Sequence, residues 1–160
     1  MPGRYTIGVK RWIVLSSLCL LMAVPARSLQ PEFRSVKTKT AEVRRDSDKK
    51  AKSAWKMWKY FVVEILKYRG DWRRVRDFEG DEGWVHKDDL DGTPCVQVKG
   101  KTANLRKTPG GTVLWELEHG YALRVFSRRG DWLEVSDLED ANGWIHVDTV
   151  WGMTDPDLFR

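Results

Sequence analysis

Residues 69–77 read RGDWRRVRD and residues 83–86 read GWVH; sixty residues later the chain reads RGDWLEVSD at 129–137 and GWIH at 143–146. Across residues 69–90 and 129–150, 11 of 22 positions are identical by direct count. Identity at this level over a constant offset indicates an internal repeat. The motif positions are Gly70, Asp71, Trp72, Gly83, Trp84 and His86 in the first copy, and Gly130, Asp131, Trp132, Gly143, Trp144 and His146 in the second.

The repeat extends upstream of this motif. Residues 39–44 (KTAEVR) match residues 101–106 (KTANLR) at an offset of 62, whereas Trp55 matches Trp115 at an offset of 60. The first copy therefore carries two extra residues between Arg44 and Trp55. The offsets divide the chain into a first domain at 31–91, a second domain at 92–152, and a tail at 153–160.

The pattern within each copy is typical of β-structure. Residues 60–66 and 121–126 are short runs rich in β-branched and aromatic residues. Residues 108–111 (TPGG) and the pair Asn142-Gly143 have the composition of tight turns. About five short strands in roughly 60 residues predict a small closed barrel. The predicted fold class is all-β, with two small barrels in tandem.

Four repeated tryptophans are expected to belong to the barrel cores or their margins: Trp72, Trp84, Trp132 and Trp144. A 60-residue domain buries only about 60% of its unfolded surface, so large apolar side chains are needed to stabilise it. Trp132 and Val135 are three residues apart and cannot share one face of a regular strand. Either a bulge intervenes or one of the two faces outward.

The GDWxxVxD segment followed by GW(V/I)H resembles the bacterial SH3 (SH3b) family, as do residues 103–106 and the Pro109-Gly110 turn. The second copy is the closer match. In the first copy Asp46-Ser47-Asp48 replaces the Pro-Gly turn, and Tyr60 stands where the second copy has Gly120. The resemblance implies SH3-like barrels of five to six strands. It also implies a non-catalytic binding module, a type that in many bacterial envelope proteins attaches to peptidoglycan or its peptide bridges.

Residues 1–28 have the features of a secretory signal peptide. A basic region precedes an apolar run from Trp12 to Val24, and small residues follow Pro25. The run is short for a membrane span, which needs about 20 residues. We therefore expect export to the periplasm, cell envelope or extracellular space, with cleavage between Ala26 and Leu29 and no stable membrane span afterwards. An uncleaved N-terminal anchor is the alternative.

Loss of this segment changes the charge balance. Of 28 Lys and Arg residues, four leave with residues 1–28 (Arg4, Lys10, Arg11 and Arg27), which leaves 24 against 23 Asp and Glu. The processed chain is then close to neutral. This balance disfavours nucleic acid as a partner.

The sequence gives little support for a catalytic or metal-binding site. Cys95 is the one cysteine outside residues 1–28 and aligns with Phe33, so we expect a small buried apolar role rather than a nucleophile. His86 and His146 occupy equivalent positions, which favours a structural role. The three histidines show no ligand spacing. The expectation is no enzymatic activity, no metal and no cofactor.

A basic stretch with aromatic residues is the candidate ligand site. Between Arg34 and Lys59 there are ten Lys or Arg residues but only three acidic ones. Clustered cations with aromatic rings suit an anionic polymer or sugar rings, although a solvated basic loop is the simpler interpretation. The candidate residues are Lys49, Lys50, Lys52, Trp55, Lys56, Trp58 and Lys59 in the first copy and Trp115 in the second.

Three functions remain open on the sequence alone. The leading one is an exported protein that binds peptidoglycan or another envelope component. The second is a protein–protein adaptor in the envelope that binds peptide segments through an aromatic groove. The third, a small nucleic-acid-binding barrel, is disfavoured by the predicted export and the near-neutral charge.

Overall fold

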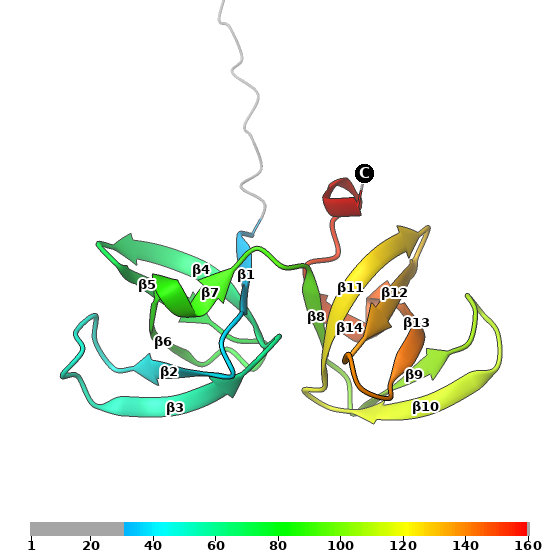
Figure 1. The fold of residues 1–160 in the computed structure, drawn as a ribbon, viewed down its shortest axis with the longest axis horizontal. Helices are drawn as coiled ribbons and strands as arrows, with labels where there is room; N and C mark the ends of the chain where they lie inside the picture. Colours follow the sequence, from blue (N-terminus) through cyan, green and yellow to red (C-terminus); the bar gives the residue numbers. More distant parts are fainter. Residues whose placement is uncertain (1–30, 160) are drawn as a thin grey trace, which may run out of the picture.

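The computed structural model describes residues 31–159, so the predicted signal peptide at 1–28 lies outside the described part. The described residues form two seven-stranded sheets, which residues 92–94 connect. Among these residues no helix has the length and apolar character of a membrane span. Figure 1 shows the sheets curled into two barrels that stand side by side. The prediction of an all-β fold with two small barrels in tandem is confirmed (Figure 1).

The two barrels have the same strand order. The first contains β1 (Phe33–Val36), β2 (Thr40–Arg44), β3 (Ser53–Trp58), β4 (Val62–Arg69), β5 (Trp72–Arg76), β6 (Glu82–His86), the 3-10 turn η1 (Lys87–Asp89) and β7 (Leu90–Asp91). The second contains β8 (Cys95–Val98), β9 (Thr102–Arg106), β10 (Val113–Glu118), β11 (Ala122–Arg129), β12 (Trp132–Ser136), β13 (Asn142–His146), η2 (Val147–Thr149) and β14 (Val150–Gly152). The orders β3-β2-β6-β5-β4-β1-β7 and β10-β9-β13-β12-β11-β8-β14 correspond strand for strand.

Strand register supports the alignment of the two copies. Val43 lies opposite Trp55 in the β2–β3 pair, and Leu105 lies opposite Trp115 in the β9–β10 pair. The two extra residues of the first copy fall in its β2–β3 loop, which runs from 45 to 52, whereas the β9–β10 loop runs from 107 to 112.

The repeated tryptophans are buried or half-buried, in agreement with the expected positions in the cores or at their margins. Trp84 is buried, but Trp72, Trp132 and Trp144 are half-buried, and aliphatic side chains fill both cores. Leu133 and Val135 are the buried hydrophobic residues of β12. Since neighbouring side chains of a strand point to opposite faces, Trp132 faces outward, and the register shift of this region lies in the opposing β11.

Gly83 and Gly143 allow two strands of each barrel to approach closely. A Cβ atom on Gly143 would lie 2.5 Å from the carbonyl oxygen of Arg106, and one on Gly83 would lie 2.3 Å from Cγ1 of Val43. Both glycines sit where the strand bearing the GW(V/I)H motif meets the strand of the upstream repeat. The close approach therefore explains why glycine stands at this position in both barrels.

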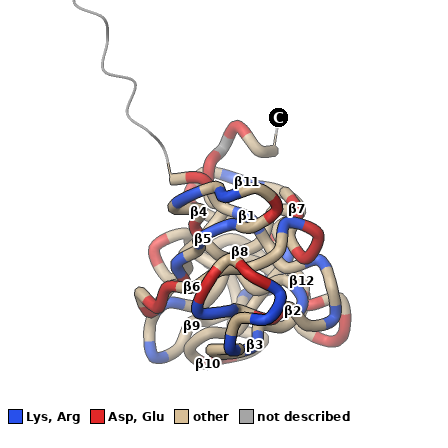
Figure 2. Tube along the Cα trace, turned by 90° about the vertical axis from the view of Figure 1, so that its left-hand side faces the viewer, with Lys and Arg blue, Asp and Glu red and all other residues tan. Residues whose placement is uncertain are grey.

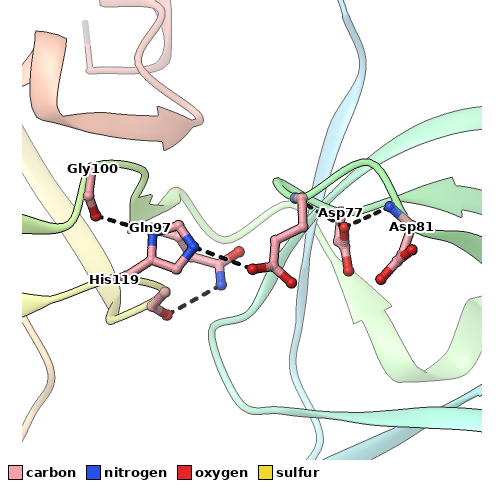
Figure 3. Close-up of polar contacts among 7 residues, drawn as sticks. Asp77, Asp81, Gln97, Gly100 and His119 are labelled. Atoms are coloured by element: carbon pink, nitrogen blue, oxygen red, sulfur yellow. Dashed lines mark hydrogen bonds and ion pairs between the residues drawn. The ribbon is translucent and has the colours of Figure 1, made fainter.

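The barrels contact each other directly. The buried Gln97 accepts a hydrogen bond from the backbone N–H of Val62 in the first barrel (2.9 Å) and donates to the carbonyl of Gly120 in its own barrel (3.3 Å). Figure 3 shows Gln97 and His119 on one side of the junction, with Asp77 and Asp81 on the other. His119 lies 3.2 Å from a carboxylate oxygen of Glu79.

Apolar groups complete this junction. The Phe78 ring lies between the rings of Phe61 and His119, with centroid distances of 6.0 and 5.0 Å. Phe33 meets Trp151 edge to face at 4.9 Å. Side chains and backbone of both barrels thus join at one interface.

The residues after β14 pack on the second barrel. Met153 is buried, and the 3-10 turn η3 (Pro156–Phe159) brings Phe159 against the core of that barrel. Figure 1 shows this turn at the top of the molecule, near the end of β11.

Candidate binding surface

The loop between β2 and β3 carries the first part of the predicted site. Its acidic residues stabilise the turn: Asp46 accepts a hydrogen bond from the N–H of Ser47, and Asp48 accepts one from the N–H of Lys50, both at 2.7 Å. Asp46 also pairs with Arg69 at 3.2 Å. Among the described residues neither carboxylate forms an ion pair with a lysine of the loop.

The predicted lysines are all exposed. Within residues 31–159 none of the five makes an ion pair. Glu42 lies opposite Lys56 in the register but pairs with Arg44 instead. Figure 2, which faces the first barrel, shows blue basic segments in the β2–β3 hairpin. The lysines concerned are Lys49, Lys50, Lys52, Lys56 and Lys59.

The two tryptophans of β3 differ in exposure. Trp58 is 66% exposed at the end of the strand, after the fully buried Met57. Trp55 is half-buried and packs against the core of the first barrel, with an indole N–H that has no hydrogen-bond partner among the described residues. Trp58 is therefore the more exposed of the two rings on this strand.

Trp115 lies in an exposed apolar segment of the second barrel. It is 52% exposed, and its neighbours Val113 and Leu114 are 43% and 45% exposed. The register shifts between Val113 and Trp115, so this part of β10 departs from regular alternation. Sequence reasoning missed Val113 and Leu114; the signal was an uninterrupted apolar run where a half-buried strand would alternate.

Both segments lie on edge strands. β3 and β10 each stand at one end of the strand order of their sheet, and Figure 1 shows both along the same side of the molecule. An edge strand presents backbone hydrogen-bonding groups to a partner. We call this region the edge surface: it consists of Lys49, Lys50, Lys52, Lys56, Trp58, Lys59, Val113, Leu114 and Trp115.

The repeated histidines act within the fold. His86 Nδ1 accepts from the N–H of Asp88 at 3.4 Å and His146 Nδ1 from that of Asp148 at 3.3 Å, so each caps a 3-10 turn. Each ring also contacts the tryptophan of the GDW segment edge to face: the centroids of His86 and Trp72 are 5.3 Å apart, and those of His146 and Trp132 are 5.0 Å apart. Beside Trp72 and His86 lies a depression of about 290 Å³ that Lys49 also lines.

Cys95 does not have the features of a nucleophile. It is fully buried, and that burial raises the pKa of its thiol to about 12, despite a hydrogen bond from Ser35. At neutral pH a thiol with this pKa is almost entirely protonated. In the part of the chain that the structure describes, no cluster of His, Cys, Asp and Glu is placed to hold a metal ion.

Comparison with known proteins gives one family. A family model described as "Bacterial SH3 domain" matches the chain twice, at residues 37–92 and 99–152. No curated protein matches the chain significantly.

Solved structures with similarity to the chain include NlpC2 and NlpC1 from Trichomonas vaginalis, at 15% and 18% identity and TM-scores of 0.36. The alignments cover 76% and 83% of this chain but only 48% and 50% of those proteins, so the chain spans about half their length. The structure named "Endolysin LysPBC5 CBD" matches at 15% identity and a TM-score of 0.33, over 78% of this chain and 96% of that one.

Proposed function

The chain belongs to the bacterial SH3 domain family, and from that membership we propose that it is an exported, non-catalytic protein that binds peptidoglycan or another component of the cell envelope. Bacterial SH3 domains are typically binding modules. Export rests on the signal-peptide pattern of residues 1–28.

The observation that carries the proposal is the set of five exposed lysines without ion pairs on the β2–β3 hairpin. Lys49, Lys50 and Lys52 lie in its loop, and Lys56 and Lys59 lie close in sequence to the exposed Trp58 at the end of β3. Ammonium groups that form no ion pair attract an anionic polymer, and an exposed indole gives a flat apolar face against which a sugar ring or peptide packs. The attraction acts over a Debye length of about 8 Å at physiological salt, so it weakens as salt rises.

The test is co-sedimentation of residues 29–160, which include every described residue, with purified peptidoglycan at about 50 and 500 mM salt. We expect binding that salt weakens. The variant Lys49→Glu/Lys50→Glu/Lys52→Glu is expected to bind about tenfold less tightly, which corresponds to about 1.4 kcal/mol. Trp58→Ala is expected to weaken binding without changing its salt dependence.

A matched control separates this site from overall charge. Lys99→Glu/Lys101→Glu/Lys107→Glu changes the net charge by the same amount at three exposed positions of the second barrel. We expect this control to retain binding. Equal loss in both triple variants would show that only net charge matters, and no sedimentation at either salt would overturn the proposal.

The adaptor function is the second candidate, favoured by the exposed segment Val113–Trp115 on the edge strand β10. A peptide that adds to an edge strand gains backbone hydrogen bonds, while apolar neighbours provide affinity. This alternative predicts capture of a defined envelope protein that Leu114→Glu abolishes and the lysine variants leave intact. Binding to peptidoglycan that Leu114→Glu does not alter would contradict it.

A further inference from the structure

Three positions at one end of the first barrel carry cations where the second barrel carries apolar residues. Arg34 lies opposite Val63 in the β1–β4 pair, as Val96 lies opposite Leu123 in the β8–β11 pair. Arg73 of β5 lies opposite Val85, and Leu133 of β12 lies opposite Ile145, which is the equivalent residue of the second GW(V/I)H motif. Lys87 and Val147 each begin the 3-10 turn after the motif histidine.

In the second barrel the equivalent positions belong to the apolar core or pack against it. Val96 and Leu133 are fully buried there, and Val147 packs against the same core. Phe159 packs against that core as well. The corresponding end of the second barrel is therefore closed by apolar groups.

The first barrel has a small open pocket at this end instead. Its volume is about 160 Å³, and it is lined by Arg34, Ile65, Tyr68, Arg73, Lys87 and Leu90. Ile65 and Leu90 are buried members of the core and form its apolar floor. Figure 2 shows basic segments beside β4 and β5 on this face of the molecule.

The described residues that line the pocket include three cations and no carboxylate. Arg34 pairs with Glu32 at 2.7 Å, and Lys87 pairs with Asp71 at 2.8 Å. Arg73 donates from Nη1 to the carbonyls of Gly70 and Trp72, and its guanidinium lies over the Tyr68 ring at 4.5 Å. Within residues 31–159 no carboxylate forms an ion pair with Arg73.

We propose that this pocket binds a terminal carboxylate that is attached to a small apolar group, with Arg73 as the principal contact. A guanidinium stacked on an aromatic ring is held in place and presents its remaining N–H groups to a carboxylate. A volume of about 160 Å³ admits one small group, and Arg73 is the lining cation that forms no ion pair with a carboxylate of the described residues. The floor of Ile65 and Leu90 suits a methyl-sized substituent next to the carboxylate.

The pocket does not include any residue of the edge surface, so this proposal and the proposed function can be tested independently. The same chemistry occurs at the end of a peptide and in a sugar acid. N-acetylalanine represents the first source and glucuronate the second. N-acetylalaninamide is the neutral counterpart, and inorganic phosphate tests for a preference for doubly charged anions.

The experiment follows backbone and arginine Nε signals of the isotope-labelled protein by NMR during titration with each probe. We expect saturable shifts at Tyr68 and Arg73 with N-acetylalanine, with a Kd of about 1–10 mM for a ligand of this size. The neutral amide is expected to give no saturable shift. Stronger binding of glucuronate than of N-acetylalanine would identify a sugar acid as the source and overturn the preference for a small apolar neighbour.

The variants use the second barrel as their template. Arg73→Leu and Arg34→Val introduce the residues that the second barrel buries at the same positions, so both are compatible with the fold. We expect each to weaken N-acetylalanine binding, Arg73→Leu by at least about tenfold. Arg74→Gln, an exposed neighbour that pairs with Glu82, removes the same charge outside the pocket and is expected to leave binding unchanged.

Three results would overturn the assignment. The first is no saturable shift at Tyr68 and Arg73 with either carboxylate. The second is equal binding by the wild-type protein and Arg73→Leu. The third is binding of inorganic phosphate in preference to both carboxylates.

Discussion

Tyr121 donates a hydrogen bond from its phenol to the carboxylate of Asp137 over 2.6 Å, whereas the equivalent pair in the first barrel, Phe61 and Asp77, lacks this donor. Burial alone would raise the pKa of Asp137, but hydrogen bonds from Tyr121 and from backbone N–H groups lower it overall. The pKa of Asp77 is raised, because burial outweighs the backbone hydrogen bonds that it accepts. The phenol of Tyr121 and the shallower burial of Asp137 thus separate the acid–base behaviour of two repeated residues.

Tyr121→Phe is expected to raise the pKa of Asp137. Because the folded-state pKa of Asp137 lies below its unfolded value, the carboxylate stabilises the second barrel above that unfolded value, and the contribution is lost as pH falls through the folded pKa. In the variant the contribution is smaller, and its loss is complete at a higher pH. Carboxyl NMR titration measures the change, with Asp77 in the same spectra as an internal control. An unchanged Asp137 titration would show that the backbone hydrogen bonds alone set its pKa.

Gln97→Met is expected to destabilise the junction of the barrels. The substitution keeps the side-chain length but leaves the buried N–H of Val62 without an acceptor, at a cost of about 1–3 kcal/mol. Amide hydrogen exchange reports it directly: the Val62 amide should exchange faster, while that of Val75, inside the first barrel, stays protected. Unaltered exchange at Val62 would contradict the assigned hydrogen bond.

Gly143→Ala is expected to destabilise the second barrel by about 2–3 kcal/mol, because its Cβ would lie 2.5 Å from the carbonyl oxygen of Arg106. Gly130→Ala is the matched control, since a Cβ there meets no atom within 4 Å and the change is limited to the strain of a φ of 59°. Chemical denaturation measures both variants. Equal destabilisation would show that β9 and β13 separate to admit the methyl group.

Glu79→Gln is expected to lower the pKa of His119. Hydrogen bonds to the carbonyl of Gly100 and to Glu79 raise this pKa in the wild-type protein. A raised histidine pKa means that the stabilising contact is fully present below the unfolded value and is lost as pH rises through the folded pKa. NMR titration of the His119 ring gives the value.

Glu82→Gln is the control for this prediction, because Glu82 pairs with Arg74 and not with His119. The control is expected to leave the His119 titration as it is in the wild-type protein. A lowered pKa in both variants would point to overall charge rather than to the contact between the barrels.

Much of the fold was predictable from the sequence, because the same pattern of strands and turns occurs in both copies of the repeat. The GDWxxVxD and GW(V/I)H segments predicted paired strands, and the offsets of 60 and 62 correctly predicted that Trp55 and Trp115 are equivalent. The exposure of the loop lysines was also predictable, because charged side chains in a turn remain in water. These features depend on residues that are close together in the chain.

The orientation of individual rings was less predictable. Trp55 and Trp58 both appeared suitable for a ligand, but only Trp58 is largely exposed, because strand alternation and the register of β3 direct Trp55 toward the core. Trp132 faces outward for the same reason. A shift of one residue in register exchanges the two faces of a strand, and short segments of sequence do not specify it.

The sequence by itself determined that this protein has two barrels, where their strands lie, and which loop is basic, because local patterns and the internal repeat encode these features. Only the tertiary structure decided which side chains meet: Gln97 with the backbone of Val62, and Arg34, Arg73 and Lys87 around one pocket. The three cations come from β1, β5 and η1. Closure of the barrel, which depends on long-range strand pairing, is what brings them together.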